Sequence, residues 1–444
     1  MVVLGGGVGG ATAARLLAEA GRSVLLVEES LIGGECLNYG CVPFKTLYRA
    51  AEILHSLSLY GAGSRPPLGY ADARARAGSI VGRLRSLLTE ELEGLGVDIV
   101  QGRGVLRGGH EVYVAGRGCV GYGKLVVATG SEPVVPRGVS IDEEVVVTNR
   151  GFLSMDELPG SMVVVGGGAI GIEAASIAAY FGSRVVVVEA MREILPFMDR
   201  LVARRLRLLL RRRGVRFILG RRVASAARSG AGAARVTLDD GTVLEADAAL
   251  IAIGRRPRTR GLGLEEAGVE LDERGFVRVD ERCRTSNPDV YAVGDVTGPP
   301  MLAHKAIAEA EAAALDILGG SGGPTPRRPR PEQVPVVVYS IPPAASIGLT
   351  EDEARRRYGG ASRIIIPFGR SSRAWIEGWG EEGVLKLVVA GGVLVGVHVL
   401  GPAAGELVAA AAPLLGRRPE PYTYPHMSTL ELLHDALLEA LKGG

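Results

Sequence analysis

The chain has 444 residues, of which 47% are hydrophobic and 23% charged, and its formal net charge at pH 7 is +2. This length suits two or more domains with substantial cores, and the near-neutral charge gives no reason to expect nucleic acid or membrane partners. No apolar run reaches the roughly 18–20 residues of a membrane-spanning helix, and no signal peptide is recognisable, so we predict a cytoplasmic protein.

Residues 1–28 predict a strand, a glycine-rich turn, a helix and a second strand that ends in an acid. Gly5 allows the tight turn, Gly7 lets a pyrophosphate approach the backbone, and Gly10 lets the helix pack on the strand. The pyrophosphate is expected at the helix N-terminus, and Glu28 can accept hydrogen bonds from ribose hydroxyls. Glycine-rich turns are common, but with Glu28 in place the pattern predicts a dinucleotide-binding unit.

Residues 33–45, which we call the cysteine segment, carry Cys36 and Cys41. A helix rises about 1.5 Å per residue and turns these two side chains to different faces, whereas a disulfide needs Cα atoms about 4.4–6.8 Å apart. The two can therefore pair only if the backbone leaves the helix, which Gly40 makes easy. We predict a helix from Pro43 to about Leu57, with Cys41 next to its N-terminus, where a thiolate is favoured. A structural disulfide and two unconnected buried thiols remain alternatives.

A second dinucleotide unit follows two predicted helical regions and a set of short strands. Gly166, Gly168 and Gly171 lie between a predicted strand and helix, and the next strand ends at Glu189. Two such patterns in one chain imply two dinucleotides. A carboxylate at Glu189 binds a free 2′-hydroxyl and repels a 2′-phosphate, so NADH is favoured over NADPH, although Arg192 is close by.

The rest of the chain predicts a buried strand before Gly254, a linker over residues 319–331, and an α+β region beyond it. The arginine-rich stretch 200–213 predicts a helix with a solvated face rather than a nucleic-acid patch. We expect strands at 334–339, 345–349, 362–367, 383–389 and 393–400, and helices at 351–358, 405–415 and 429–441.

These motifs together resemble the class I pyridine nucleotide–disulfide oxidoreductases. The likeness includes the cysteine segment, ATGS at 128–131, AIGRRP at 252–257 and YAVGD at 291–295. It covers essentially the whole chain and implies an α/β fold with two Rossmann-like domains, for FAD and NAD, and a C-terminal α+β dimerisation domain. The boundaries that we expect are 1–148 and 266–330 for the FAD-binding domain, 149–265 for the NAD-binding domain, and 331–444 for the dimer-interface domain.

The resemblance also implies the catalytic residues. Cys36 and Cys41 would form a redox disulfide that exchanges electrons with a dithiol substrate, FAD and NAD. The sequence from His426 to Glu431 aligns with H-P-T-x-S-E, although Met427 and two neighbours depart from it. In the family, this His reaches the disulfide of the other subunit of a homodimer and the Glu orients its ring. Imidazole suits this task because it exchanges protons near neutral pH.

The same resemblance implies the cofactor contacts, and no metal site is expected. The residues expected to contact FAD are Gly5, Gly7, Gly10, Glu28, Gly34, Lys45, Gly104, Thr129, Gly130, Ser131, Asp295, Met301, Leu302, Ala303 and His304. Those expected to serve NAD are Gly166, Gly168, Ala169, Ile170, Gly171, Glu173, Glu189, Val223 and Gly254. Lys45 and Glu173 match an ion pair of the family.

Within the family, elimination favours the dihydrolipoamide dehydrogenases, acting on dihydrolipoamide or a lipoyl domain. Mercuric reductases lack the His, and glutathione reductases prefer NADPH, against Glu189. Phe44 and Glu35 stand where the family usually has Ser and often has Thr. The alternatives are a mercuric or glutathione reductase-like enzyme, a flavin NADH oxidase or diaphorase, and a non-enzymatic scaffold.

Overall fold

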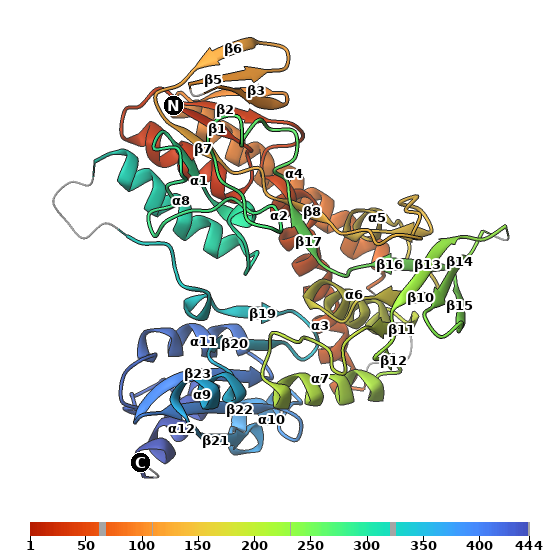
Figure 1. Cartoon of the computed structure of the whole chain (residues 1–444). Coiled ribbons are helices and arrows are strands. Elements are labelled where there is room, and N and C mark those ends of the chain that lie inside the picture. Colours follow the sequence, from red (N-terminus) through yellow and green to blue (C-terminus); the bar gives the residue numbers. More distant parts are fainter. Residues whose placement is uncertain (62–67, 109, 231, 320–325, 443–444) are drawn as a thin grey trace. The chain divides into compact units, whose positions relative to one another are not determined.

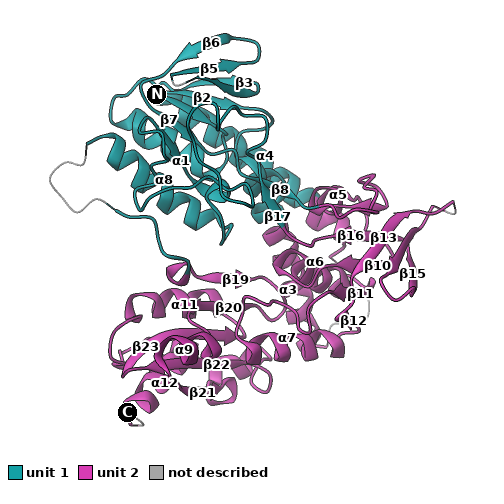
Figure 2. Cartoon of the chain, in the orientation of Figure 1, with its two compact units in different colours: residues 1–43, 75–134, 255–331 teal, residues 44–74, 135–254, 332–444 magenta. Residues whose placement is uncertain are grey.

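The structure is a computed structural model that describes residues 1–61, 68–108, 110–230, 232–319 and 326–442 (Figure 1). The chain divides into two compact units, each assembled from separate stretches (Figure 2). Unit 1 comprises residues 1–43, 75–134 and 255–331, and unit 2 comprises residues 44–74, 135–254 and 332–444. Each unit contains a parallel sheet with helices, which confirms the α/β class. The finer division into four domain segments stays a prediction.

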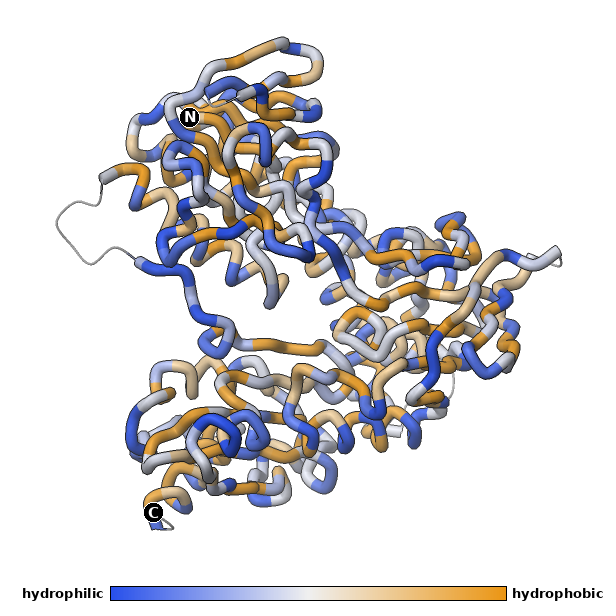
Figure 3. The backbone as a smooth tube through the Cα atoms, in the orientation of Figure 1, coloured by the Kyte–Doolittle hydropathy of each residue, from blue (hydrophilic) through white to orange (hydrophobic). Residues whose placement is uncertain are grey.

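Unit 1 is built on a five-stranded parallel sheet in the order β18-β7-β1-β2-β3. Its central strand pairs on both sides, so that Val3 lies between Leu26 and Val126, and all three side chains are buried. Such strands consist almost entirely of apolar residues because both faces are covered, and the same hydrophobic runs follow the central strands in Figure 3. The elements are β1 (Val2–Leu4), α1 (Val8–Glu19), β2 (Leu25–Glu28), α2 (Gly34–Tyr39), β3 (Asp98–Gln101), β4 (Gly104–Arg107), β5 (Glu111–Val114), β6 (Gly118–Gly121), β7 (Leu125–Val127), β8 (Ser131–Pro133), β17 (Arg255–Pro257), β18 (Val290–Ala292), the 3-10 helix η1 (Gly294–Thr297) and α8 (Ala303–Ile317).

Unit 2 contains a second parallel sheet, in the order β12-β11-β10-β16-β9, and an antiparallel sheet in the order β19-β20-β23-β22-β21. One buried cluster joins Val164 of the parallel sheet to Leu400 of the antiparallel sheet. The elements are β9 (Val146–Val147), α5 (Asn149–Ser154), β10 (Ser161–Val165), α6 (Ala169–Tyr180), β11 (Arg184–Glu189), α7 (Arg200–Arg212), β12 (Arg216–Leu219), β13 (Val223–Arg228), β14 (Ala234–Leu238), β15 (Val243–Ala246), β16 (Ala248–Ile251), η2 (Pro331–Gln333), β19 (Val336–Val338), β20 (Ala344–Gly348), α9 (Glu351–Tyr358), β21 (Ser362–Pro367), η3 (Phe368–Arg370), α10 (Ser372–Ile376), β22 (Val384–Ala390), β23 (Val393–Leu400), α11 (Ala404–Ala411), η4 (Ala412–Leu414) and α12 (Leu430–Lys442).

Two helices, α3 (Cys41–Leu59) and α4 (Tyr70–Gly94), carry the chain between stretches assigned to different units. Helix α3 begins at Cys41, two residues before the predicted start. Part of the predicted linker, residues 320–325, lies outside the described residues. Within the described ranges, no helix has both the length and the apolar character needed to cross a membrane.

A buried ion cluster connects three elements of unit 2. The Lys386 ammonium on β22 lies 2.7 Å from a carboxylate oxygen of Asp199 and 2.7 Å from one of Glu351. Asp199 also caps α7 by accepting a hydrogen bond from the Leu201 backbone. Burial alone would raise the pKa of Asp199, but the charges of His398 and Lys386 and its hydrogen bonds hold that pKa below its ordinary value. The cluster therefore stays charged while buried.

His55 on α3 lies in an aromatic cluster of unit 2. Its ring stacks on Trp379 at 4.2 Å between centroids, and its Nδ1 lies 3.1 Å from the Arg213 guanidinium and 3.4 Å from the Tyr180 hydroxyl. A guanidinium can only donate, so Nδ1 accepts and the proton belongs on Nε2. Burial, and then the positive charge of Arg213, lower the pKa of His55 to about 4.

This cluster predicts a loss of stability in mild acid. Between about pH 6.5 and pH 4 the unfolded chain takes up a proton that the folded chain does not bind, so the free energy of unfolding falls by at most about 3 kcal/mol as the pH is lowered. Urea unfolding followed by tryptophan fluorescence at pH 7 and pH 5 measures this fall. His55→Phe should lose the part of this fall that His55 contributes and keep the part due to His398, a second buried histidine whose pKa is lowered by burial. His110→Gln, at a residue whose side chain is 70% exposed, should retain the whole fall.

Candidate active site

The first glycine-rich turn of unit 1 leaves no room for side chains at Gly5 and Gly10 and is shaped to hold a dinucleotide. A Cβ on Gly10 would lie 1.8 Å from the Gly5 carbonyl oxygen, and Gly5 itself has a φ of +101°. The Glu28 carboxylate accepts hydrogen bonds from the backbone of Gly6 at 2.6 Å and of Ser30 at 2.7 Å. The N-terminus of α1 and a carboxylate from the end of β2 therefore meet at this turn, which fits the pyrophosphate and ribose of FAD.

The cysteine segment is attached directly to this turn. Gly33 donates its backbone N–H to the Gly6 carbonyl at 2.8 Å, and a Cβ on Gly34 would lie 2.7 Å from the Gly7 Cα. The side-chain amide of Asn38, between the two cysteines, donates to the carbonyls of Ile32 at 3.0 Å and Gly34 at 2.9 Å. The dinucleotide turn therefore fixes the place of the cysteines.

Helix α2 ends at Tyr39, and the next residue breaks the helix as predicted. Gly40 has φ −143° and ψ −112°, outside the helical range. A Cβ on Gly40 would lie 3.4 Å from the Cys36 Cα, so the chain turns back on itself before Cys41. Both cysteines are half-buried. The turn supplies the departure from regular helix that a Cys36–Cys41 pair requires.

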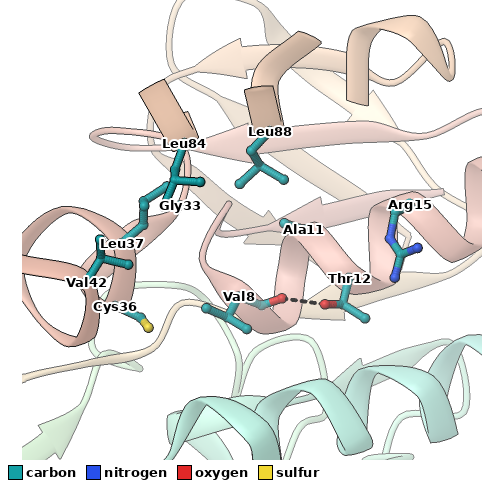
Figure 4. A pocket seen from close by; sticks show the side chains of 10 residues that line it. All are labelled: Val8, Ala11, Thr12, Arg15, Gly33, Cys36, Leu37, Val42, Leu84 and Leu88. Carbon is teal, nitrogen blue, oxygen red and sulfur yellow. Dashed lines mark hydrogen bonds between the residues drawn. The ribbon is translucent and has the colours of Figure 1, made fainter. Parts of the chain in front are cut away.

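A pocket of about 300 Å³ opens beside Cys36 (Figure 4). Figure 4 shows Cys36 near Val8 and Val42, with further residues of α1, α2 and α4 and the N-cap Gly33 forming the rest of the wall. The Thr12 hydroxyl is occupied because it donates to the Val8 carbonyl at 2.8 Å. The lining residues are Val8, Ala11, Thr12, Arg15, Gly33, Cys36, Leu37, Val42, Leu84 and Leu88.

Unit 2 repeats the same arrangement around the second glycine turn. A Cβ on Gly171 would lie 2.0 Å from the Gly166 carbonyl oxygen. The Glu189 carboxylate accepts from the backbone of Gly167 at 2.6 Å and of Met191 at 2.7 Å, as Glu28 does in unit 1. The second turn therefore also fits a dinucleotide, with its carboxylate held in place.

Lys45 and Glu173 form an ion pair in unit 2, at 2.9 and 3.1 Å from the ammonium to the two carboxylate oxygens. Tyr339 supports both partners, because its backbone N–H donates to Glu173 at 2.9 Å and its ring centroid lies 4.6 Å from the Lys45 ammonium. The sequence did not single out Tyr339, since neither contact depends on a recognisable spacing. Phe44, where the family usually has Ser, is buried and stacks on Phe152.

His426 and Glu431 form the expected dyad. The Nδ1 of His426 lies 2.6 Å from the Glu431 carboxylate, and 79% of the His426 side chain is exposed. The carboxylate assigns the proton to Nδ1, which leaves Nε2 as the accepting atom. His434 is engaged elsewhere, because its Nδ1 lies 2.6 Å from the Tyr422 carbonyl oxygen.

The other predicted contacts lie on the same two turns or on segments of unit 1 and unit 2, and their roles toward the cofactors stay predictions. In unit 1, the Ser131 hydroxyl donates to Asp295 at 2.5 Å. Packing alone explains the glycine at position 104, since a Cβ there would lie 2.5 Å from the Leu4 side chain. The remaining positions are Thr129 and Gly130 between β7 and β8, Met301 and Leu302 before α8, Ala303 and His304 in its first turn, Ala169 and Ile170 at the start of α6, Gly168 at its N-cap, Val223 at the start of β13, and Gly254 before β17. Among the described residues, no group of three or more His, Cys, Asp or Glu side chains could hold a metal ion.

Comparisons with known proteins agree with this geometry. Residues 1–310 match the family described as pyridine nucleotide-disulphide oxidoreductase, and residues 334–417 match the dimerisation domain of that family. A dihydrolipoyl dehydrogenase of Thermus scotoductus is 39% identical, over 93% of this chain and 89% of that protein. A mitochondrial dihydrolipoyl dehydrogenase of Pisum sativum is 36% identical, over 93% of this chain and 84% of that protein.

A solved structure of a flavoprotein disulfide reductase has the same fold as this chain. The HOCl-induced flavoprotein disulfide reductase RclA from Escherichia coli superposes with a TM-score of 0.88 at 30% identity, and the match covers 98% of this chain and 99% of that one. Two family matches, close relatives over most of their length and a shared fold all point to one assignment. The chain therefore belongs to the pyridine nucleotide–disulphide oxidoreductases, a family of enzymes that use FAD and NAD.

Proposed function

We propose that this enzyme oxidises dihydrolipoamide to lipoamide with NAD⁺ as acceptor, using Cys36 and Cys41 as the redox pair. Two related enzymes that cover most of the chain carry the name dihydrolipoyl dehydrogenase. We further propose that the enzyme works as a homodimer in which each subunit lends His426 to its partner. The substrate is a small dithiol or a lipoyl domain, and the cytoplasm stays the predicted location.

The observation that carries this proposal is the apolar pocket beside Cys36. Six of its lining side chains are aliphatic, which suits a dithiol on a hydrocarbon chain better than a charged tripeptide such as glutathione. The one charged lining residue, Arg15, has Glu19 at 3.5 Å and Glu91 at 3.8 Å. These carboxylates offset the charge that would otherwise attract an anionic substrate.

The residues of the chain can then be given roles. Nε2 of the proposed base, His426, accepts a proton from one substrate thiol, and Glu431 stabilises the imidazolium that forms. The substrate thiolate attacks the sulfur of Cys36, breaking the Cys36–Cys41 bond and releasing Cys41 as a thiolate at the start of α3. The second substrate thiol displaces Cys36, so that lipoamide leaves and both cysteines are reduced. FAD, when bound, supplies the two-electron carrier between the thiols and NAD⁺.

Steady-state rates measured side by side test the proposal. We expect dihydrolipoamide with NAD⁺ to be turned over far faster than glutathione disulfide or Hg²⁺ with NADH. Faster turnover of glutathione disulfide or Hg²⁺ would assign the enzyme to another branch of the family. Rapid oxygen consumption with NADH alone would favour the NADH oxidase alternative.

Glu189 predicts the nicotinamide preference. Its carboxylate is fixed by the backbone N–H groups of Gly167 on the glycine turn and of Met191, so it cannot move away from a 2′-phosphate. Because like charges brought together cost several kcal/mol, we expect kcat/KM for NADH to exceed that for NADPH by about 10²-fold. Glu189→Gln should reduce this ratio, whereas Glu193→Gln, at a residue paired with Arg207, should leave it unchanged. A preference for NADPH in the unaltered enzyme would contradict the role given to Glu189.

A further inference from the structure

Glu35, the residue before Cys36, has an ionic partner in unit 1 that the family resemblance does not account for. The Nη2 atom of Arg255 lies 3.4 Å from a Glu35 carboxylate oxygen, and only 12% of the Arg255 side chain is exposed. Arg255 begins β17, which pairs with β8 so that Pro257 lies opposite Ser131. The pair therefore connects the cysteine segment to a strand that is distant in sequence.

The same guanidinium also holds Ser131. Its Nε donates to the Ser131 hydroxyl at 2.7 Å, and its Nη2 donates to the Ser131 carbonyl at 2.9 Å. The hydroxyl in turn donates to Asp295 at 2.5 Å. A continuous chain of polar contacts thus runs from Glu35 through Arg255 and Ser131 to Asp295.

Arg255 places a positive charge between two acidic side chains. Glu35 and Asp295 each carry a negative charge when ionised, and the Arg255 guanidinium contacts Glu35 directly and Asp295 through Ser131. A carboxylate beside a thiol disfavours the thiolate, whereas a neighbouring cation favours it. The backbone keeps Glu35 near the cysteines, since a Cβ on Gly40 would lie 3.0 Å from the Glu35 carbonyl oxygen.

We propose that Arg255 is a positioning residue for the cysteine segment: it neutralises Glu35 and ties it, through Ser131, to Asp295. The inference rests on Cys36 and Cys41 being the redox pair of the proposed function. Glu35 replaces the neutral Thr that the family often has, and Arg255 cancels the charge which that replacement introduces. Removing either partner should therefore change thiol reactivity, in opposite directions.

The test is the rate at which iodoacetamide alkylates Cys36 and Cys41 in the reduced full-length holoenzyme, from pH 6 to pH 9 without oxygen, with mass spectrometry to assign the sites. Arg255→Leu should lower the rate at pH 7 by about 3–10-fold and move the rate profile to higher pH. Glu35→Gln should raise the rate, because Arg255 then acts without its counter-charge. The double variant should fall near the wild type, and Arg255→Lys should restore part of the rate.

Arg256→Leu is the matched control, because Arg256 neighbours Arg255 on β17 but pairs with Glu132 at 2.7 Å. Effects of the same sign, a double variant that stays as slow as Arg255→Leu, or changes no larger than those of the control would overturn the proposal. Dihydrolipoamide turnover is measured in parallel. Opposite effects on the thiols in an enzyme that does not oxidise dihydrolipoamide would reject the proposed substrate and leave the role of Arg255 standing.

Discussion

Cys41→Ser should lower NAD⁺-dependent oxidation of dihydrolipoamide by about 10⁴-fold or more. A serine hydroxyl cannot form or release the sulfur–sulfur bond on which the exchange depends, so no substrate thiol can pass on its electrons by this route. Reduction of an artificial dye by NADH does not need the cysteine pair and should continue in the same variant. Stopped-flow and steady-state assays of both reactions on one preparation give the comparison.

Cys119→Ser is the control for this variant. Cys119 is an exposed cysteine on β6, and its backbone pairs with Tyr113. Its replacement should leave both reactions unchanged. Substantial dihydrolipoamide turnover by Cys41→Ser would show that the two cysteines of the cysteine segment do not act as a pair. That result would contradict the proposed function.

His426→Ala should slow dihydrolipoamide oxidation by roughly 10²–10⁴-fold while sparing dye reduction. The reason is the loss of the atom that accepts the substrate proton, since the contact with Glu431 leaves Nε2 as the acceptor. His434→Ala is the matched control, because its ring is bound to the Tyr422 carbonyl and should not affect the rate. An unimpaired His426→Ala enzyme would require a different base.

A hybrid dimer tests whether the base acts across subunits. Co-expressing a Cys41→Ser chain and a His426→Ala chain with different tags allows the mixed dimer to be purified. If each His426 serves the partner, one of the two sites in the mixed dimer has every group intact and about half of the wild-type activity returns. If His426 serves its own chain, both sites are broken and the mixed dimer stays as slow as its parents.

Much of the fold and of the dinucleotide turns could be predicted because the determinants are local. Gly5 and Gly10 are close in sequence, and the contact between them follows from the turn alone. The break at Gly40 was predictable for the same reason, although α3 starts at Cys41 and not at Pro43. The short helices α5 and α10 were not predicted, because each has only five or six residues and little periodicity.

The parts of the site that sequence reasoning missed depend on distant contacts. Leu84 and Leu88 line the pocket from α4, but a long helix does not reveal from its sequence which turn will face Cys36. In the sequence, Arg255 stood out only as one residue of the AIGRRP motif. Its pairing with Glu35 depends on how β17 pairs with β8. Side-chain partners of this kind are set by tertiary packing, which local patterns do not encode.

The ion cluster around Lys386 has a consequence for dissecting or recombining this enzyme. Its two short contacts join β22 to Asp199 at the N-cap of α7 and to Glu351 on α9. A fragment beginning near residue 334 would keep Glu351 but lose Asp199, together with the apolar side chains before residue 334, such as Val164, that belong to the same buried cluster as Leu400. We therefore expect such a fragment to aggregate when expressed alone, and chimeras with related enzymes to fold only when both halves of this cluster come from the same parent.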